Sequence, residues 1–100
     1  MTEFKKKALD TLDDIFNLVE SKYDNYEVDY ENANLKIDSL EGRGTFIVSI
    51  HSPTSQIWLS SPISGAHHFE SKSKDSVEWI STRDTNINLK QLLIKELGSK

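Results

Sequence analysis

The N-terminal part of the chain alternates apolar and polar positions with the period of an α-helix. Between residues 4 and 22, apolar side chains recur at steps of three and four: Ala8, Leu9, Leu12, Ile15, Phe16 and Val19. At about 100° per residue these side chains fall on one side of a helix. Polar and acidic side chains fall on the opposite side: Asp10, Asp13, Asp14, Asn17 and Glu20. The pattern predicts an amphipathic helix with an anionic outer face.

A two-residue alternation, typical of β-strands, follows the helix. In the first predicted strand, Tyr26, Val28 and Tyr30 share one face, and acidic residues occupy the other. Further strands are predicted at residues 35–38, 45–50, 56–61, 67–70 and 77–81, with turns between them. Val77 and Trp79 are expected on the core face of the last strand, and residues 71–76 are expected to be a solvated loop.

The C-terminal segment carries start and stop signals of a second helix. Asn88 is a good N-cap with Gln91 three residues on, and Ile87 can pack on Leu92 as a hydrophobic staple. Gly98 is the expected C-terminal stop. The stripe expected to be buried consists of Leu89, Leu92, Leu93 and Leu97.

A helix, several strands joined by short turns and a second helix predict an α+β two-layer sandwich. We expect one domain over residues 1–100, with an antiparallel sheet of about five to seven strands and both helices on one face. If Ile57 and Leu59 face the core, Trp58 stands on the opposite face between Gln56 and Ser60. Trp is enriched at interface hot spots, so Trp58 is a candidate contact for a partner, unless a second layer covers it.

The composition excludes cysteine-dependent sites, and the sequence has no apolar run of membrane-spanning length. The chain has no Cys, which excludes disulfides, thiolate metal sites and cysteine-ligated clusters. No apolar run approaches the ~20 residues of a membrane span. Residues 1–7 have neither the apolar core of a secretion signal nor an Arg/Ser-rich transit peptide. We expect a cytoplasmic protein of a prokaryote, with a mature form in the mitochondrial matrix as the alternative.

Charge is strongly segregated along the chain. The formal net charge is −4, yet residues 8–41 hold ten Asp or Glu residues against two Lys residues. Such a field attracts cations or a basic partner and repels nucleic acid. On the predicted helix, Asp10, Asp13 and Asp14 repel one another, and a bound cation would offset that repulsion. Oxygen-only shallow sites suit Ca²⁺, Mg²⁺, Mn²⁺, Fe³⁺ and, more weakly, Fe²⁺, whereas the simpler interpretation is a solvated face.

Histidine and serine residues give no sign of hydrolase chemistry. His67 and His68 are adjacent on a predicted strand and therefore point to opposite faces, so they are not expected to chelate one ion. Ser60 and Ser61 have no base beside them in the sequence and no nucleophile-elbow glycines. A hydrolase is therefore not expected.

The segment Gln56-Ile57-Trp58-Leu59-Ser60-Ser61-Pro62-Ile63-Ser64-Gly65 closely resembles the central strand and turn of the frataxin family. Supporting matches are Leu9-Asp10-Thr11-Leu12, Gly44-Thr45-Phe46, Trp79 and the segment from Leu89 to Leu97. Frataxins are small iron-binding proteins that act on iron–sulfur cluster assembly, with two terminal helices on one side of a sheet. The resemblance therefore implies the same fold and a role in iron delivery or regulation.

The resemblance implies that acidic residues bind iron, as Fe²⁺ or Fe³⁺, weakly. Asp10, Asp14, Asp24 and Glu27 fall at positions that are acidic in the family, whereas Asn17, Leu18 and Ser21 depart from mitochondrial relatives. Nearby carboxylates complete the candidate metal-binding set, which is Asp10, Asp13, Asp14, Glu20, Asp24, Glu27, Asp29 and Glu31.

The resemblance also implies a partner surface for a cysteine desulfurase and its scaffold protein. Its candidate residues are Gln56, Trp58, Ser60 and His68. His68 stands where the mitochondrial branch often has a basic residue, and Ser49 stands where that branch has Asn. A monomer is expected, with an iron-dependent oligomer as a further state.

Three functions remain to be compared. The first is a non-enzymatic iron-binding regulator or iron supplier of cluster assembly. The second is a ferroxidase and iron store that oxidises Fe²⁺ on the acidic residues. The third uses Trp58 as a base-stacking platform for RNA, which the acidic charge disfavours.

Overall fold

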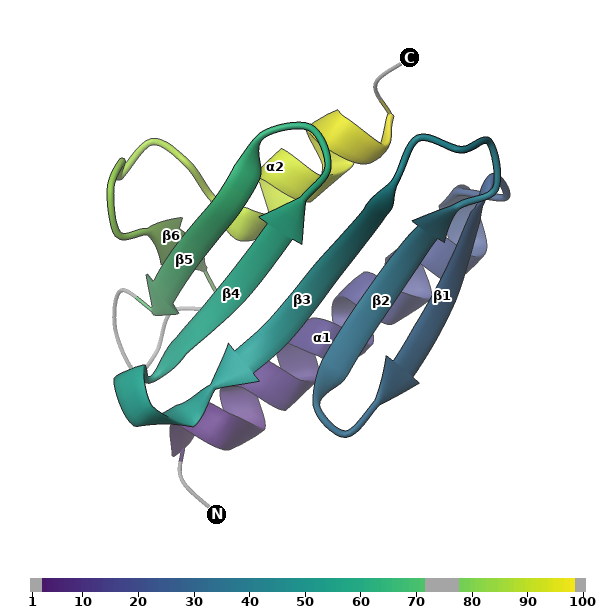
Figure 1. Cartoon of the computed structure of the whole chain (residues 1–100). Coiled ribbons are helices and arrows are strands. Elements are labelled where there is room, and N and C mark those ends of the chain that lie inside the picture. The colour runs from purple at the N-terminus through teal and green to yellow at the C-terminus, as the bar shows by residue number, and fades with distance from the viewer. Residues whose placement is uncertain (1–2, 72–77, 99–100) are drawn as a thin grey trace.

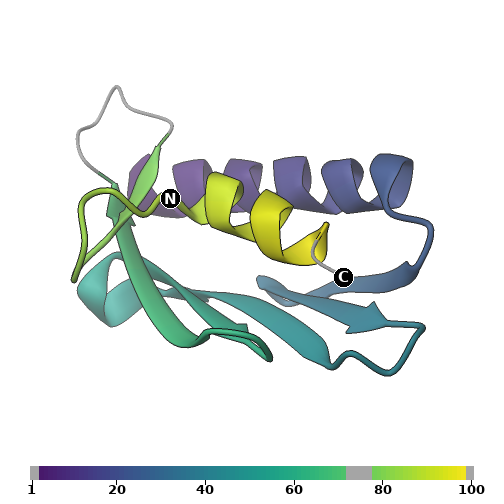
Figure 2. The ribbon, with the colours of Figure 1, turned by 90° about the horizontal axis from the view of Figure 1, so that it is seen from above.

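The computed structural model describes residues 3–71 and 78–98, and it arranges them as a sheet with two helices on one face (Figures 1 and 2). The helices are α1 (Glu3–Lys22) and α2 (Leu89–Leu97), with a 3₁₀ turn, η1, at Ser52–Thr54. The strands are β1 (Tyr26–Glu31), β2 (Asn34–Ser39), β3 (Thr45–His51), β4 (Gln56–Ser61), β5 (Gly65–Ser71) and β6 (Trp79–Ser81). The predicted α+β sandwich is confirmed.

The sheet is an antiparallel meander with six strands in the order β1-β2-β3-β4-β5-β6. Short turns explain this order, because each strand pairs with its neighbour in sequence. The β1–β2 turn has positive φ at Asn32 (51°) and Ala33 (62°), the conformation of a type I′ hairpin. This turn sets the register in which Val28 lies opposite Ile37.

The buried core lies between the helices and the sheet, as Figure 2 shows. Ala8, Leu12, Ile15 and Val19 of α1 are buried there, as the helical period predicts. Their partners across the layer include Leu35, Ile37, Phe46, Val48, Ile57, Leu59 and Phe69. Tyr26 is buried, and Val28 and Tyr30 pack against the core from the same face of β1.

Trp79 anchors the short strand β6 under α1. It is 2% exposed, its indole Nε1 donates to Thr11 Oγ1 at 2.7 Å, and Phe4 packs edge-on against it at 5.9 Å. The prediction that Trp79 faces the core is confirmed, whereas Val77 lies outside the described residues. The predicted loop at 71–76 also lies outside them, except for Ser71, which is the last residue of β5 rather than part of a loop.

Helix α2 begins as its sequence signals predict. The Asn88 side chain accepts hydrogen bonds from the backbone N–H groups of Lys90 and Gln91, at 3.0 and 3.3 Å. Leu89, Leu93 and Leu97 are buried, and Leu92 packs against the core while partly exposed. Gly98 follows as the C-cap.

Candidate functional site

The acidic residues of α1 point away from the core. Asp10, Asp13, Asp14 and Glu20 are all exposed, and so is Asp24 in the connection to β1. They nevertheless do not form one group, because successive helical positions turn them toward different neighbours. Asp10 and Asp14 line a cavity between α1 and α2, whereas Asp13 lies close to β1 through Tyr30.

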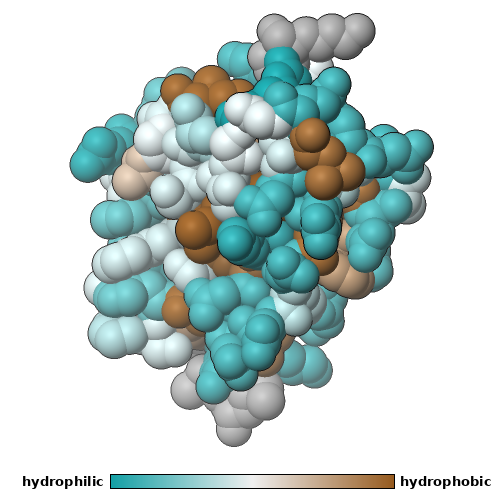
Figure 3. Space-filling view, turned by 45° about the vertical axis from the view of Figure 1, so that its right-hand side comes forward, coloured by the Kyte–Doolittle hydropathy of each residue, from teal (hydrophilic) through white to brown (hydrophobic). Residues whose placement is uncertain are grey.

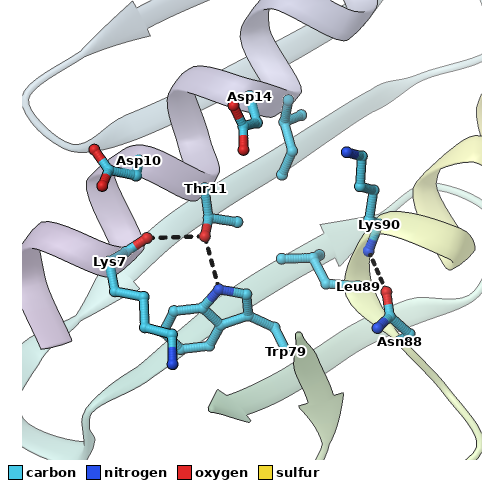
Figure 4. A pocket seen from close by; sticks show the side chains of 9 residues that line it. Lys7, Asp10, Thr11, Asp14, Trp79, Asn88, Leu89 and Lys90 are labelled. Atoms are coloured by element: carbon cyan, nitrogen blue, oxygen red, sulfur yellow. Dashed lines mark hydrogen bonds between the residues drawn. The ribbon is translucent and has the colours of Figure 1, made fainter. Parts of the chain in front are cut away.

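A cavity of about 170 Å³ lies between α1 and α2, where Asp10 and Asp14 line it from α1 (Figure 4). Trp79 and Leu89 form part of its lining, and Thr11 is held there by a hydrogen bond to the Lys7 carbonyl at 2.8 Å. Lys7 and Lys90 also belong to the lining, but the Lys7 ammonium donates to Ser71 Oγ and points away from both carboxylates (Figure 4).

Tyr30 reports on the other flank of α1. Burial, a hydrogen bond to Asp13 and the charges of Asp13 and Asp10 together raise the pKa of Tyr30 from 10.0 to about 12. Burial is the largest cause, and the two carboxylates act in the same direction because they disfavour the phenolate. Asp13 and Tyr30 thus connect the helix to β1.

We expect Asp13→Asn to lower the pKa of Tyr30 toward 10, since the variant removes a negative charge beside the phenol. The raised pKa also means that Tyr30 contributes stability below pH 10, and that this contribution is lost as the pH rises to about 12. The measurement is an alkaline titration followed by tyrosinate absorbance. Subtracting the titration curve of Tyr30→Phe from that of the parent isolates the signal of Tyr30 from those of the other two tyrosines. An unchanged difference titration in Asp13→Asn would show that Asp13 does not cause the shift.

The acidic residues of β1 lie on the opposite side of the sheet from α1. Tyr26 and Val28 point inward, so the alternation of the strand sends Glu27, Asp29 and Glu31 to the face without helices. Asp29 lies directly across from Lys36 on β2, and Lys36 Nζ also lies 3.6 Å from Asp38 Oδ2. Lys36 therefore places one positive charge next to β1, and its ion pair is with Asp38 of β2.

The eight predicted metal-binding residues do not form one group, because Asp10 and Asp14 line the α1–α2 cavity and only three of the eight lie on β1. We refer to these three exposed acids, Glu27, Asp29 and Glu31, as the acidic edge. Figure 3 brings this flank forward and shows hydrophilic side chains over much of it, with separate apolar patches. Among residues 3–71 and 78–98, no three His, Cys, Asp or Glu side chains are grouped so that they could hold one metal ion. The acidic edge offers exposed carboxylate oxygens, which suit hard cations at low affinity.

Trp58 stands on the helix-free face of the sheet between two imidazole rings. The His51 ring stacks on it at 3.8 Å with an interplanar angle of 14°, and the His68 ring stacks at 4.3 Å with 15°. His51 comes from β3 and His68 from β5, the strands on either side of β4, so one ring covers each face of the indole. Trp58 is half-buried for this reason, although no helix lies over it.

The other predicted partner-binding residues lie around this stack. Gln56 Oε1 accepts from the Trp58 Nε1–H group at 2.8 Å, which fixes the orientation of the indole. Ser60 lies two residues after Trp58 on the same face of β4 and is exposed. His67 points to the other face from His68, as predicted, and its Nε2 lies 2.8 Å from Ser64 Oγ.

Sequence reasoning missed the role of His51. It assigned no partner to this residue, whereas the β3–β4 register places His51 opposite Gln56 and diagonal to Trp58. Alternation along β3 was the available signal, because it puts His51 on the same face as Ser49, which lies opposite Trp58. We refer to His51, Trp58 and His68 as the Trp58 stack.

Sequence reasoning also missed a buried carboxylate behind the β4–β5 turn. Ser61 was expected to lack a neighbouring base, but its hydroxyl donates to Glu96 Oε1 of α2 at 2.6 Å. Ser61 Oγ in turn accepts from the backbone N–H groups of Ile63 and Ser64, at 3.0 and 3.1 Å. Glu96 is 6% exposed and Ser61 is 7% exposed, so this contact fastens the turn to α2.

We expect Glu96→Ala to lower the free energy of unfolding by about 1–3 kcal/mol, because it leaves the buried Ser61 hydroxyl proton without its acceptor. Urea unfolding followed by circular dichroism measures this change. Ser61→Ala is the matched variant, and it should cost at least as much because two backbone N–H groups also lose their acceptor. If Glu96→Ala unfolded at the same urea concentration as the parent, the contact would have no net stabilising effect.

Comparison with known proteins agrees with this fold. The whole chain, residues 1–100, matches the family described as "Frataxin-like domain". It is 41% identical over 79 residues to the mitochondrial frataxin homolog of Schizosaccharomyces pombe, a match over 77% of this chain and 49% of the relative. It is 36% identical over 102 residues to mitochondrial frataxin of Arabidopsis thaliana, covering 95% of this chain and 52% of that protein. The chain thus spans about half the length of these relatives.

Solved structures show the same architecture. A trimeric frataxin from the yeast Saccharomyces cerevisiae, complexed with ferrous iron, superposes with a TM-score of 0.73 at 26% identity, over 97% of this chain and 83% of that one. A frataxin from Psychromonas ingrahamii gives a TM-score of 0.80 at 18% identity over 97% of this chain and 89% of that chain, a likeness of fold alone. With a family match over its full length and close frataxin relatives, this chain belongs to the frataxin family.

Proposed function

We propose that residues 1–100 act as one frataxin-like domain that binds iron weakly and regulates iron–sulfur cluster assembly, or supplies iron to it, by binding the cysteine desulfurase–scaffold complex. The family is known for iron binding and iron–sulfur assembly. The observation that carries the proposal is the pairing of two surface features: exposed carboxylate oxygens around β1, and the half-buried Trp58 stack on a sheet face that no helix covers. The first suits a cation, and the second suits a protein partner.

Iron is the cargo in this proposal. The acidic edge gives exposed oxygen ligands without a fixed cage, so ions bind at low affinity and leave easily. The absence of Cys means that a cysteine-ligated cluster cannot be assembled on this chain. Delivery or regulation is therefore the role that these residues support.

The decisive experiment is an anaerobic NMR titration of labelled protein with Fe²⁺, followed by the desulfurase–scaffold complex. We expect iron to broaden signals of residues 10–31, and the complex to extend the changes to Trp58. The combined variant Asp10→Asn, Asp13→Asn, Asp14→Asn should lose the broadening on α1, whereas Glu70→Gln, which removes an exposed carboxylate from β5, should keep it. No response to iron or to the complex would overturn the proposal.

For the partner surface we expect Trp58→Ala to abolish binding of the desulfurase–scaffold complex while the protein stays folded. Removing the ring from a helix-free face deletes the contact area of the interface without opening the core. Ile94→Ala is the matched control, because Ile94 is a 42% exposed apolar residue on α2. Binding by pull-down or calorimetry, with circular dichroism to check folding, gives the answer; retained binding in Trp58→Ala would contradict the assigned surface.

The main competing function is a ferroxidase and iron store. The trimeric state of the yeast relative complexed with ferrous iron makes an iron-dependent oligomer of this chain worth testing. Catalytic oxidation needs a defined coordination site, and the dispersed carboxylates favour the regulator. Oxygen consumption on adding Fe²⁺, abolished in the Asp10, Asp13 and Asp14 variant, would favour the ferroxidase instead.

RNA binding and location complete the proposal. Both faces of the Trp58 indole are covered, which leaves no free face for a stacked base and argues against an RNA platform.

No helix in the described part of the chain is long and apolar enough to cross a membrane. We propose the cytoplasm of a prokaryote as the site of action and keep the mitochondrial matrix as the alternative, because the relatives are named as mitochondrial proteins.

A further inference from the structure

The surroundings of the Trp58 stack are poor in charge. On the helix-free face of the sheet, Gln56 and Ser60 are the neighbours of Trp58 along β4. The titratable residue of β3 on this face is His51. On β5 the open face carries His68 and Glu70, and Ile80 of β6 lies opposite Glu70. Lys36 and Asp38 lie further off on β2, the acidic edge lies beyond them on β1, and both helices lie on the other side of the sheet.

We propose that the Trp58 stack is a proton-controlled docking surface for an acidic segment of the partner. This inference rests on the proposed function, because it specifies how the same surface recognises its partner. Imidazole takes up a proton between pH 5 and 8. Proton uptake by His51 and His68 changes the centre of the sheet face from neutral to cationic.

The geometry allows this change of charge without a change of shape. A cationic ring stacked on an indole face is attracted to it, so protonation favours the stacked arrangement. Thr54 Oγ1 lies 2.7 Å from His51 Nδ1 and 3.4 Å from the His51 carbonyl oxygen. If the Thr54 hydroxyl donates to that carbonyl, it accepts from Nδ1–H, and the new proton goes to Nε2 with this contact intact.

The acidic character of the docked segment follows from charge complementarity. A carboxylate placed over the Trp58 stack meets two ionisable imidazoles and one nearby acid, Glu70. The acidic edge, by contrast, attracts basic segments. The sheet face therefore has an anionic end at β1 and a proton-dependent cationic centre at β4, which also fixes the orientation of a partner with opposite charges.

The first experiment uses the protein alone. A cationic imidazole in contact with an indole quenches its fluorescence, so we expect tryptophan emission to fall as the pH goes from 8 to 5. The chain has two tryptophans, and Trp79 is buried against Phe4 and Thr11, so Trp58→Phe should show a flat emission profile. The double variant His51→Gln, His68→Gln should also be flat. His67→Gln, which alters the histidine on the other face, should keep the parent profile. A flat parent profile, or loss of the pH response in His67→Gln alone, would overturn the inference.

The second experiment measures binding of the desulfurase–scaffold complex at pH 8 and pH 6. The double variant His51→Gln, His68→Gln is measured at the same two pH values. Any change in affinity that comes from titration of the partner itself therefore appears in both proteins and cancels in the comparison. We expect the parent to gain about fivefold in affinity at pH 6 relative to the double variant, as exposed charge pairs do. Binding with an equal pH response in both proteins would overturn the inference alone. Weaker binding of the parent at pH 6 would show that the docked segment is basic and would also overturn it. No binding at either pH would overturn the proposed function and the inference together.

Discussion

Replacing Gly44 with alanine is expected to lower the free energy of unfolding by about 3 kcal/mol, the sum of backbone strain and a steric clash. Gly44 ends the β2–β3 turn with φ at +111°, where L residues are strained. A Cβ atom there would lie 2.5 Å from Pro62 Cβ and 3.1 Å from Pro62 Cγ. Because Pro62 is a rigid ring in the neighbouring β4–β5 turn, the clash is relieved only by moving one turn relative to the other.

Gly42→Ala is the matched control for this prediction. Gly42 lies in the same turn with φ at +76°, but a Cβ atom there would meet nothing within 4 Å. Only the backbone strain remains, so we expect a loss of about 1 kcal/mol. Urea unfolding of both variants separates the two terms. Equal losses at the two positions would show that contact with Pro62 has no energetic weight.

The second large effect is expected at Trp79. Trp79→Ala should lower the free energy of unfolding by about 3–5 kcal/mol, because it empties the space beneath α1 and removes the hydrogen bond to Thr11. This loss is a large part of the 5–15 kcal/mol that typically stabilises a domain, so a substantial unfolded population is expected near 37 °C. Thermal and urea unfolding followed by circular dichroism measure the change.

Trp58→Ala provides the internal comparison, since it removes the same side chain from the open face. We expect it to cost about 1 kcal/mol, the size of the aromatic stacking with His51 and His68. Trp79→Phe keeps an aromatic ring but removes the N–H donor. Its loss of unfolding free energy should lie between those of Trp58→Ala and Trp79→Ala. If Trp58→Ala were as destabilising as Trp79→Ala, Trp58 would be a core residue and its loss of partner binding would have a different cause.

The elements of this fold could be predicted from local patterns because each pattern is set by one element at a time. The 3.6-residue period of Ala8, Leu12, Ile15 and Val19 gave α1, and all four residues are buried in the structure. Alternation gave the strands, with ends displaced by one or two residues where turns and strands share residues such as Gly65. The Asn88 cap is equally local, since the accepting oxygen and the donated N–H groups lie within three residues.

The candidate site could be predicted only in part. The residue types predicted carboxylate ligands for cations and a tryptophan on the helix-free face. In the structure the carboxylates are exposed and Trp58 is half-buried. Their grouping was not predictable, because Asp13 lies by Tyr30, Asp10 and Asp14 line the α1–α2 cavity, and the acids of β1 lie across the sheet. Which carboxylates share a cation depends on these directions, which helix packing sets.

By itself, the sequence determined the helices, most strand positions, the inward face of each element and the strongly acidic segment, because hydrophobic period and charge are properties of the local chain. Only the tertiary structure decided which side chains meet across elements. Strand register brought His51 and His68 to the two faces of Trp58. The packing of α2 brought Glu96 to Ser61, and that of β6 brought Trp79 to Thr11. The physical reason is that such contacts join residues 7 to 68 positions apart, whose distance is fixed by the whole set of turns and packed layers rather than by any local pattern.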